Sequence, residues 1–182
     1  MATISPPEIT PEDLLAIRDR PMPELVEGEL VERPMGQKSD GIASLLLFYL
    51  MQHVVPNRLG WVNGAQGSYQ IFPDDPKKVR IPDGSFTRLE RLPNGFSEGH
   101  GRVAPDLVFE IISPKDLAED LEHKVMDYLS AGIPMVWVVY PRARVVRVIR
   151  GDGTGGHLRS GDVLSGEDIL PGFTCPVASL FG

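Results

Sequence analysis

The feature that most constrains this chain is the stretch from Ala104 to Pro114, which reads Ala-Pro-Asp-Leu-Val-Phe-Glu-Ile-Ile-Ser-Pro. An apolar run of this length, with a proline near each end, predicts a short and deeply buried strand. Neighbouring side chains on a strand point to opposite faces, so Asp106, Glu110 and Ile112 share one face. A carboxylate in the middle of such a strand is costly unless a cation pairs with it. We therefore take Glu110 as the centre of a candidate site.

Two further segments supply charged groups for this site. Residues 80–86, Arg-Ile-Pro-Asp-Gly-Ser-Phe, predict a strand that carries Asp83, and a helix predicted over residues 117–131 carries Lys124 beside its apolar stripe. Each signal has an ordinary structural alternative. A Pro-Asp dipeptide usually marks a strand start or a turn, and a helix lysine usually lies in solvent. The order of the three, Pro-Asp, then a buried strand glutamate, then lysine, favours a metal-dependent nuclease site.

The chemistry explains why these residue types belong together. Hydrolysis of a phosphodiester needs a cation that screens the phosphate and activates water, and Mg²⁺ prefers carboxylate oxygens. We expect Asp83 and Glu110 to hold one Mg²⁺ or Mn²⁺ ion, with the main-chain carbonyl of Ile111 as a candidate third ligand. We expect Lys124 to orient the attacking water or to stabilise charge in the transition state.

The rest of the chain predicts a mixture of helices and strands. A helix is expected from Thr10, with Pro11 at its first position and Asp13 completing the cap. The next elements are expected as a hairpin over 24–32 and a helix over 39–54, capped by Ser39 or Asp40 and closed by Pro56 and Gly60. Residues 61–72 are expected to form one strand, or two with a bend at Gly64 or Gly67. A strand over 81–87, a loop over 88–103, a hairpin over 135–149 and a last hairpin before the C-terminal tail complete the expected elements. This order favours an α/β fold of the mixed α+β kind. We expect an N-terminal arm over 1–9 and a single domain over 10–182.

The composition limits the kinds of site the chain can form and the compartment in which we expect it. The chain has 182 residues, of which 42% are hydrophobic and 24% charged, as in an ordinary globular protein. Cys175 is the only cysteine, so an internal disulfide and a cysteine-based zinc site are excluded. The longest apolar run is well below the roughly 20 residues of a membrane span. The first residues lack the basic start and apolar core of a signal peptide. We therefore expect a cytoplasmic protein with no membrane contact.

The charge balance bears on nucleic acid. A formal net charge of −7 argues against a protein that coats nucleic acid, but it leaves a nuclease open because carboxylates around a metal add negative charge. Basic side chains are concentrated at Arg80, at Arg88 and over residues 142–150. We expect these side chains to meet phosphates.

The chain resembles a known family. It is similar to the Uma-two family of restriction-endonuclease-like proteins, formerly a domain of unknown function, within the PD-(D/E)XK nuclease superfamily. The segments that carry the resemblance are Glu24–Leu30, Ile81–Phe86, Ala104–Pro114, Asp120–Lys124, Ala131–Pro134, Trp137–Pro141 and Leu170–Phe173. The resemblance extends over nearly the whole chain. It implies a restriction-endonuclease-like core in which a central mixed sheet is flanked by helices.

The resemblance also implies roles for individual residues. Asp83 would be the acid of the Pro-Asp element and Glu110 the second acid. The superfamily usually places its lysine two residues after that acid, where this sequence has Ile112; the resemblance implies that Lys124 has taken over from the helix. Asp106 is a candidate additional acid, ranked second because it lies about 13 Å from Glu110 along a strand. Glu29 resembles a family position that supports the site, although a surface hairpin glutamate explains it equally well.

Two functions from different classes remain open on the sequence. The first is a Mg²⁺-dependent endonuclease-like hydrolase that acts on DNA. The second is a non-catalytic binding or assembly module that keeps the nuclease fold, which the acidic charge and the missing lysine at position 112 favour. A homodimer fits either function, because two sites related by a two-fold axis match the symmetry of a DNA duplex.

Overall fold

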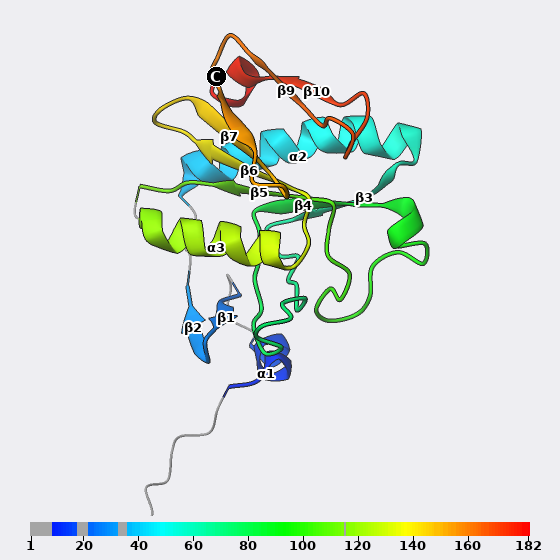
Figure 1. The fold of residues 1–182 in the computed structure, drawn as a ribbon, viewed down its shortest axis with the longest axis vertical. Helices are drawn as coiled ribbons and strands as arrows, with labels where there is room; N and C mark the ends of the chain where they lie inside the picture. Colours follow the sequence, from blue (N-terminus) through cyan, green and yellow to red (C-terminus); the bar gives the residue numbers. More distant parts are fainter. Residues whose placement is uncertain (1–8, 18–21, 33–35, 115) are drawn as a thin grey trace, which may run out of the picture.

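The computed structural model describes residues 9–17, 22–32, 36–114 and 116–182. Its centre is a six-stranded sheet with the strand order β3-β4-β5-β6-β7-β8. Figure 1 shows α2 on one side of this sheet and α3 on the other, with α1 and the β1–β2 hairpin beyond the α3 side. The predicted mixed α/β fold is therefore confirmed. Most of the arm predicted over residues 1–9 lies outside the described residues, and the division into an arm and one domain stays a prediction.

The elements follow the chain in a simple order. The central strands are β3 (Gly60–Gly64), β4 (Gly84–Arg88), β5 (Leu107–Ile111), β6 (Met135–Tyr140), β7 (Val145–Arg150) and β8 (Gly155–Leu158). The remaining elements are α1 (Pro11–Ala16), β1 (Glu24–Val26), β2 (Glu29–Val31), α2 (Gln37–Asn57), η1 (Leu89–Arg91), α3 (Ala118–Ser130), β9 (Val163–Ser165), β10 (Thr174–Pro176) and η2 (Val177–Leu180). Strands β5 and β6 are parallel because α3 carries the chain back between them, whereas the other neighbours in the sheet are antiparallel.

Strand β5 separates two apolar cores, as its alternation predicts. Leu107, Phe109 and Ile111 pack in the core that contains α2. Val108 packs in the core on the α3 side, together with the apolar stripe of α3. Because Glu110 is two residues from Val108, its side chain points to the α3 side. The fold thus aims the buried carboxylate at the helix that carries Lys124.

The N-terminal elements form as the sequence predicts. Thr10 caps α1 in a capping box with Asp13, and Pro11 occupies the first turn. Strands β1 and β2 pair as a hairpin whose turn residues, Glu27 and Gly28, have φ angles of 52° and 82°. This left-handed pair is the geometry of a two-residue hairpin turn that matches the twist of the strands.

Some predicted boundaries are wrong. Helix α2 begins two residues before Ser39, with Gly36 as its N-cap, because the Ser39 hydroxyl turns inward and donates to the Ile112 carbonyl at 3.5 Å. It also continues one residue beyond Pro56. A proline in the last turn removes only one hydrogen bond, so the helix ends just after it rather than before it.

The strands before the site are shorter than predicted. Strand β3 ends at Gly64, one of the two predicted bends, but residues 65–72 form no second strand, and Tyr69 there makes isolated bridges to Arg80 and Gly101. Strand β4 starts at Gly84 instead of Ile81, since the residues before it pair with other partners. Asp83 therefore lies just before β4, at the end of the strand and not within it.

A close approach between two strands generates a stability prediction. A Cβ atom added at Gly84 would lie 2.3 Å from the Cζ atom of Phe109, which is buried in the α2 core. We expect Gly84→Ala to lower the free energy of unfolding by about 1–3 kcal/mol because the ring must move within a packed core. The measurement is the urea unfolding midpoint. Gly156→Ala in β8 is the control, since an added Cβ there meets no atom within 4 Å, and equal midpoints for the two variants would contradict the prediction.

Candidate active site

The side chain of Glu110 is held by two residues of α3. The Tyr128 hydroxyl donates to Oε1 of Glu110 at 2.7 Å, and the Lys124 ammonium donates to Oε2 at 3.0 Å. Lys124 and Tyr128 are four residues apart and therefore lie one turn apart on the same face of the helix. The Lys124 residue is only 1% exposed. The structure thus brings Glu110 and Lys124 together, as the spacing of the helix stripe predicts.

A second glutamate, Glu24 of β1, shares the same ammonium. Its Oε1 lies 2.8 Å from the Lys124 Nζ and also accepts the Ile81 amide at 2.9 Å. The carbonyl of Ile81 accepts from the Lys124 ammonium at 3.0 Å. The buried amine is therefore fixed from three sides. The sequence did not single out Glu24, because the weak alternation of the hairpin segment gives no reason to prefer it over the other hairpin glutamates.

An ion-pair network continues outward from Glu24. The Arg80 guanidinium donates to Glu24 Oε2 at 2.9 Å and, through Nε, to Asp127 of α3 at 2.8 Å. Lys78 donates to the same Asp127 at 2.7 Å. Arg80 is only 4% exposed, so the prediction that it meets phosphates is wrong. It instead holds the β1 hairpin against α3.

Asp83 faces the same hollow from the opposite side. Its Oδ2 accepts the main-chain amide of Ile111 at 2.6 Å, which ties the start of β4 to the end of β5. A hollow of about 180 Å³ opens here. Its lining includes five carboxylates and one ammonium, from Glu24, Asp40, Asp83, Glu110, Asp116 and Lys124. The predicted trio of Asp83, Glu110 and Lys124 therefore converges on one solvent-open hollow.

The electrostatics divide the three central acids into two kinds. Burial raises the pKa of Asp83 to about 7, and the charge of Glu110 adds to the rise. Burial likewise raises the pKa of Glu110, against the opposing charge of Lys124. Burial also acts on Glu24, but Lys124 and Arg80 outweigh it and hold the Glu24 pKa below its ordinary value. Glu24 is therefore the fixed counter-ion of the ammonium, whereas Asp83 and Glu110 lack full compensation.

The donor set around Asp83 and Glu110 fits a hard divalent cation. Mg²⁺ is usually held by one or two carboxylates, and water and substrate phosphates complete its shell. Two under-compensated carboxylates at the wall of a solvent-open hollow match this pattern. Within the described residues, three or more His, Cys, Asp or Glu side chains do not gather into a cage for a metal. The fit is thus to an open site with two protein carboxylates.

Besides Glu24, the sequence reasoning missed two further acids that line the hollow. Asp116 follows the buried strand, and its carboxylate accepts the Ser113 amide at 2.7 Å. Its charge contributes to the raised pKa of Asp83. Asp40 reaches the rim of the hollow from the first turn of α2. A Ser-Pro-x-Asp turn directly after a strand is a signal that would have pointed to Asp116.

Two candidate residues lie elsewhere. Asp106 is buried beyond the other end of β5, where it accepts the Arg88 amide at 2.9 Å and the Arg91 guanidinium at 3.0 Å. Glu29 is exposed on β2 and lines a separate hollow together with Lys78 and Asp127. Neither side chain lines the hollow of Asp83. Any contribution of these two residues to the site stays a prediction.

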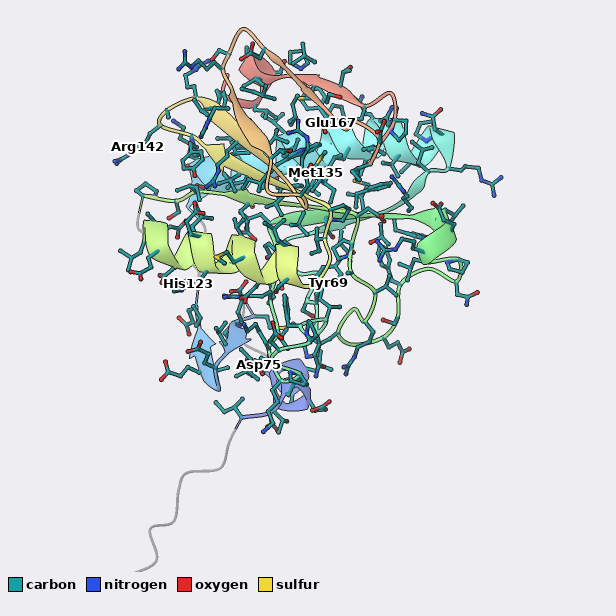
Figure 2. The ribbon with its side chains drawn as sticks, viewed as in Figure 1. Tyr69, Asp75, His123, Met135, Arg142 and Glu167 are labelled. Carbon is teal, nitrogen blue, oxygen red and sulfur yellow. The ribbon has the colours of Figure 1, made fainter. Side chains whose placement is uncertain are left out.

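The arginine-rich hairpin of β6 and β7 is engaged in ion pairs. Arg147 pairs with Glu122, and the Arg150 Nε donates to Glu167 at 2.7 Å. The Arg144 guanidinium donates to the carbonyl of Gly182 at 3.2 Å. Figure 2 shows Arg142 extending outward at the end of this hairpin. Much of the positive charge expected to meet phosphates is therefore already neutralised.

Comparison with known proteins agrees with this architecture. A crystal structure of a protein described as a “putative nuclease” from Anabaena variabilis superposes with a TM-score of 0.77 over 95% of this chain and 97% of that chain. The two sequences are 22% identical, so this likeness defines the fold. No curated protein matches the sequence.

The chain has the architecture of a restriction-endonuclease-like protein. A family whose description is “Putative restriction endonuclease” matches residues 11–178. The chain belongs to this family, Uma2, the Uma-two family that the sequence resembles. Among the described residues, no helix has the length and apolar character needed to cross a membrane.

The raised pKa of Asp83 generates a pH prediction. The folded protein keeps a proton on Asp83 up to about pH 7, whereas the ordinary value is 3.8, so the free energy of unfolding should fall as pH rises through this interval. Asp83→Asn removes this contribution. We expect the variant to gain stability relative to the unmutated protein as pH rises from about 5 to about 8.

Urea unfolding at several pH values, without divalent metal, measures this difference. Asp40→Asn, at the exposed rim of the same hollow, serves as the control. Parallel stability profiles for Asp83→Asn and the unmutated protein would show that Asp83 does not titrate near neutrality.

Proposed function

We propose that this protein is a Mg²⁺-dependent, endonuclease-like phosphodiester hydrolase that acts on DNA. The observation that carries the proposal is the pair of under-compensated carboxylates, Asp83 and Glu110, which face one hollow beside the buried ammonium of Lys124. A divalent cation is the charge that such a pair lacks. Membership of a family described as restriction endonucleases supports DNA as the substrate.

The residues that line the hollow would have different roles in the reaction. Asp83 and Glu110 would hold Mg²⁺ or Mn²⁺, which supplies screening of the phosphate and a lowered pKa for bound water. Tyr128 keeps the Glu110 carboxylate in place through its hydroxyl. Lys124, fixed by Glu24, would donate to the attacking water or to the charge that develops on the phosphate.

The raised pKa of Asp83 sets a pH condition on this chemistry. The carboxylate must lose its proton before it binds a cation, and its pKa is about 7 without metal. Metal binding therefore displaces a proton, and affinity should fall below neutral pH.

The oligomeric state and the cellular compartment are also part of the proposal. Cleavage of both strands of a duplex is served by two active sites related by a two-fold axis, so we propose a homodimer. The single cysteine, Cys175, is a buried free thiol, which suits a reducing cytoplasm.

A non-catalytic module is the second candidate, and one observation favours it. The Lys124 ammonium is shared between two glutamates at 2.8 Å and 2.9 Å, so its charge is already offset. An amine held in this way has less charge left to offer to a phosphate. The two functions differ in whether the protein cuts DNA.

The first test is cleavage of supercoiled plasmid in Mg²⁺ or Mn²⁺. We expect Glu110→Gln to lower the rate by at least about a hundredfold, because glutamine keeps the hydrogen-bonding shape but not the charge that holds the cation. Glu119→Gln, also exposed on α3, is the matched control and should cut at the unmutated rate. Equal cutting by the two variants would remove Glu110 from the mechanism. No cutting by the unmutated protein would favour the non-catalytic module.

The second test follows metal binding without any reaction. Titration with Mn²⁺, read from the electron paramagnetic resonance signal of free ion, should give one site per chain. We expect Asp83→Asn and Glu110→Gln each to weaken binding at least about tenfold, since each removes a carboxylate ligand. Asp106→Asn, a buried acid outside the hollow, should bind Mn²⁺ as tightly as the unmutated protein. Equal loss in all three variants would mean that the metal is not bound at this hollow.

A further inference from the structure

A second hollow lies beside the candidate active site, and the proposed function does not use it. Its volume is about 380 Å³, and Gln66 lines both hollows. The turn that follows β3 therefore forms the partition between them. Side chains that line the second hollow include Asn63, Tyr69, Thr87, Phe96 and Arg102. The second hollow combines an aromatic ring, an amide and a guanidinium in one depression.

Strand β4 connects the two hollows along one side of the sheet. Asp83 directly precedes β4, and Ser85 and Thr87 alternate along it on one face. Ser85 is paired with Val108, which packs on the α3 side, so these side chains face the same side as Glu110. The residues from 83 to 87 span about 13 Å of extended chain. The two hollows therefore lie at successive positions along β4 on one side of the sheet, and Gln66 lines both of them.

Three polar side chains between the hollows are joined by hydrogen bonds. The hydroxyls of Tyr69 and Ser85 are 2.6 Å apart, and the Asn63 amide donates to the Tyr69 hydroxyl at 3.2 Å. Figure 2 shows Tyr69 on the α3 side of the sheet. This network fixes the position of the Asn63 side chain. An amide held in place can present hydrogen-bonding groups to the flat edge of a base.

Phe96 stands at the second hollow as an exposed aromatic ring. It is 50% exposed and lies 5.2 Å from the ring of Trp61. Trp61 is itself anchored, because its indole N–H donates to the Leu92 carbonyl at 2.9 Å. Further along the same loop, the buried His100 lies 2.8 Å from Ser68 Oγ through Nδ1. The loop thus presents Phe96 on a fixed support, as a stacking platform requires.

These groups match the chemistry of a nucleobase. A base offers a flat face for Phe96 and a hydrogen-bonding edge for Asn63, and the exposed Arg102 can meet its phosphate. A base inside a duplex is stacked and paired, and it reaches such a pocket only after it leaves the stack. A single-stranded or locally unpaired segment presents its bases without this cost.

We propose that the second hollow binds the base of an unpaired nucleotide next to the phosphate that would meet the cation at Asp83 and Glu110. The substrate is then single-stranded DNA or DNA with an unpaired segment, in preference to a continuous duplex. This inference rests on the proposed function for its reading of the first hollow. The base-binding property itself needs no cleavage and is tested apart from it.

The test is fluorescence anisotropy with a labelled single-stranded oligonucleotide, without divalent metal, so that the strand stays intact. The full chain should bind the single strand more tightly than the same sequence as a duplex. We expect Phe96→Ala to weaken binding of the single strand by between about fivefold and about a hundredfold, the range that loss of one stacked base gives. Phe96→Trp should restore binding, since its ring also stacks.

The control variant is Phe48→Ala, because Phe48 on α2 is 52% exposed but does not line the hollow. It should bind as the unmutated protein does. A second strand, with abasic sites in place of its bases, should bind weakly and equally to the unmutated protein and to Phe96→Ala. This abasic comparison separates contacts to bases from contacts to phosphates.

Several results would overturn the inference. These are equal binding by Phe96→Ala and Phe48→Ala, equal binding of abasic and intact strands, a preference for duplex, or no binding of the single strand. If Phe96→Ala does not fold, Asn63→Leu replaces it, with the same expected loss for intact strands only. Binding of the single strand without its cleavage in Mg²⁺ or Mn²⁺ would sink the proposed hydrolase and leave the base-binding hollow standing.

Discussion

The site depends on one buried ammonium shared between two carboxylates. Lys124 of α3 bonds Glu110 of β5 and Glu24 of β1, and so joins two consecutive elements to a hairpin strand that is distant in the sequence. Buried ion pairs rarely add net stability, because desolvation offsets their attraction, yet removal of one partner costs about 3–5 kcal/mol. Stability alone therefore does not account for this arrangement. A geometric role does, since the triad fixes the position of Glu110 relative to Asp83.

The same triad determines where negative charge is left over. Glu24 receives both Lys124 and Arg80, so it is fully compensated and its pKa is lowered. Glu110 shares one ammonium with Glu24, and the charge of Glu110 in turn raises the pKa of Asp83. The network thus concentrates its uncompensated charge at the wall of one hollow. It also explains why Arg80 is unavailable to DNA, because its guanidinium is needed as the counter-ion of Glu24 and Asp127.

Local sequence patterns predicted the parts of the site that depend on local geometry. Alternation along β5 placed Glu110 on the same face as Asp106 and Ile112, and the helical pattern placed Lys124 beside the apolar stripe. That α3 covers this face, and that Tyr128 bonds Glu110, follows only from the packing. The role of Glu24 depends on how the β1 hairpin packs against α3, which no local period encodes. The start of α2 was predicted wrongly for a related reason. Ser39 is a good capping residue in isolation, but packing turned its hydroxyl toward Ile112.

The superfamily usually has a lysine where this chain has Ile112, and this difference fits the packing on the α3 side of the sheet. Ile112 packs against the apolar core that contains Val125 and Tyr128, so a lysine at this position would replace apolar contacts with a second buried amine. The helix can supply the amine without that cost, because Lys124 reaches Glu110 from the element that already covers the face. The end of β5 then carries only Glu110 and the Ile111 amide toward Asp83. The hollow stays open beside these groups, and Thr87, four residues after Asp83, lines the second hollow.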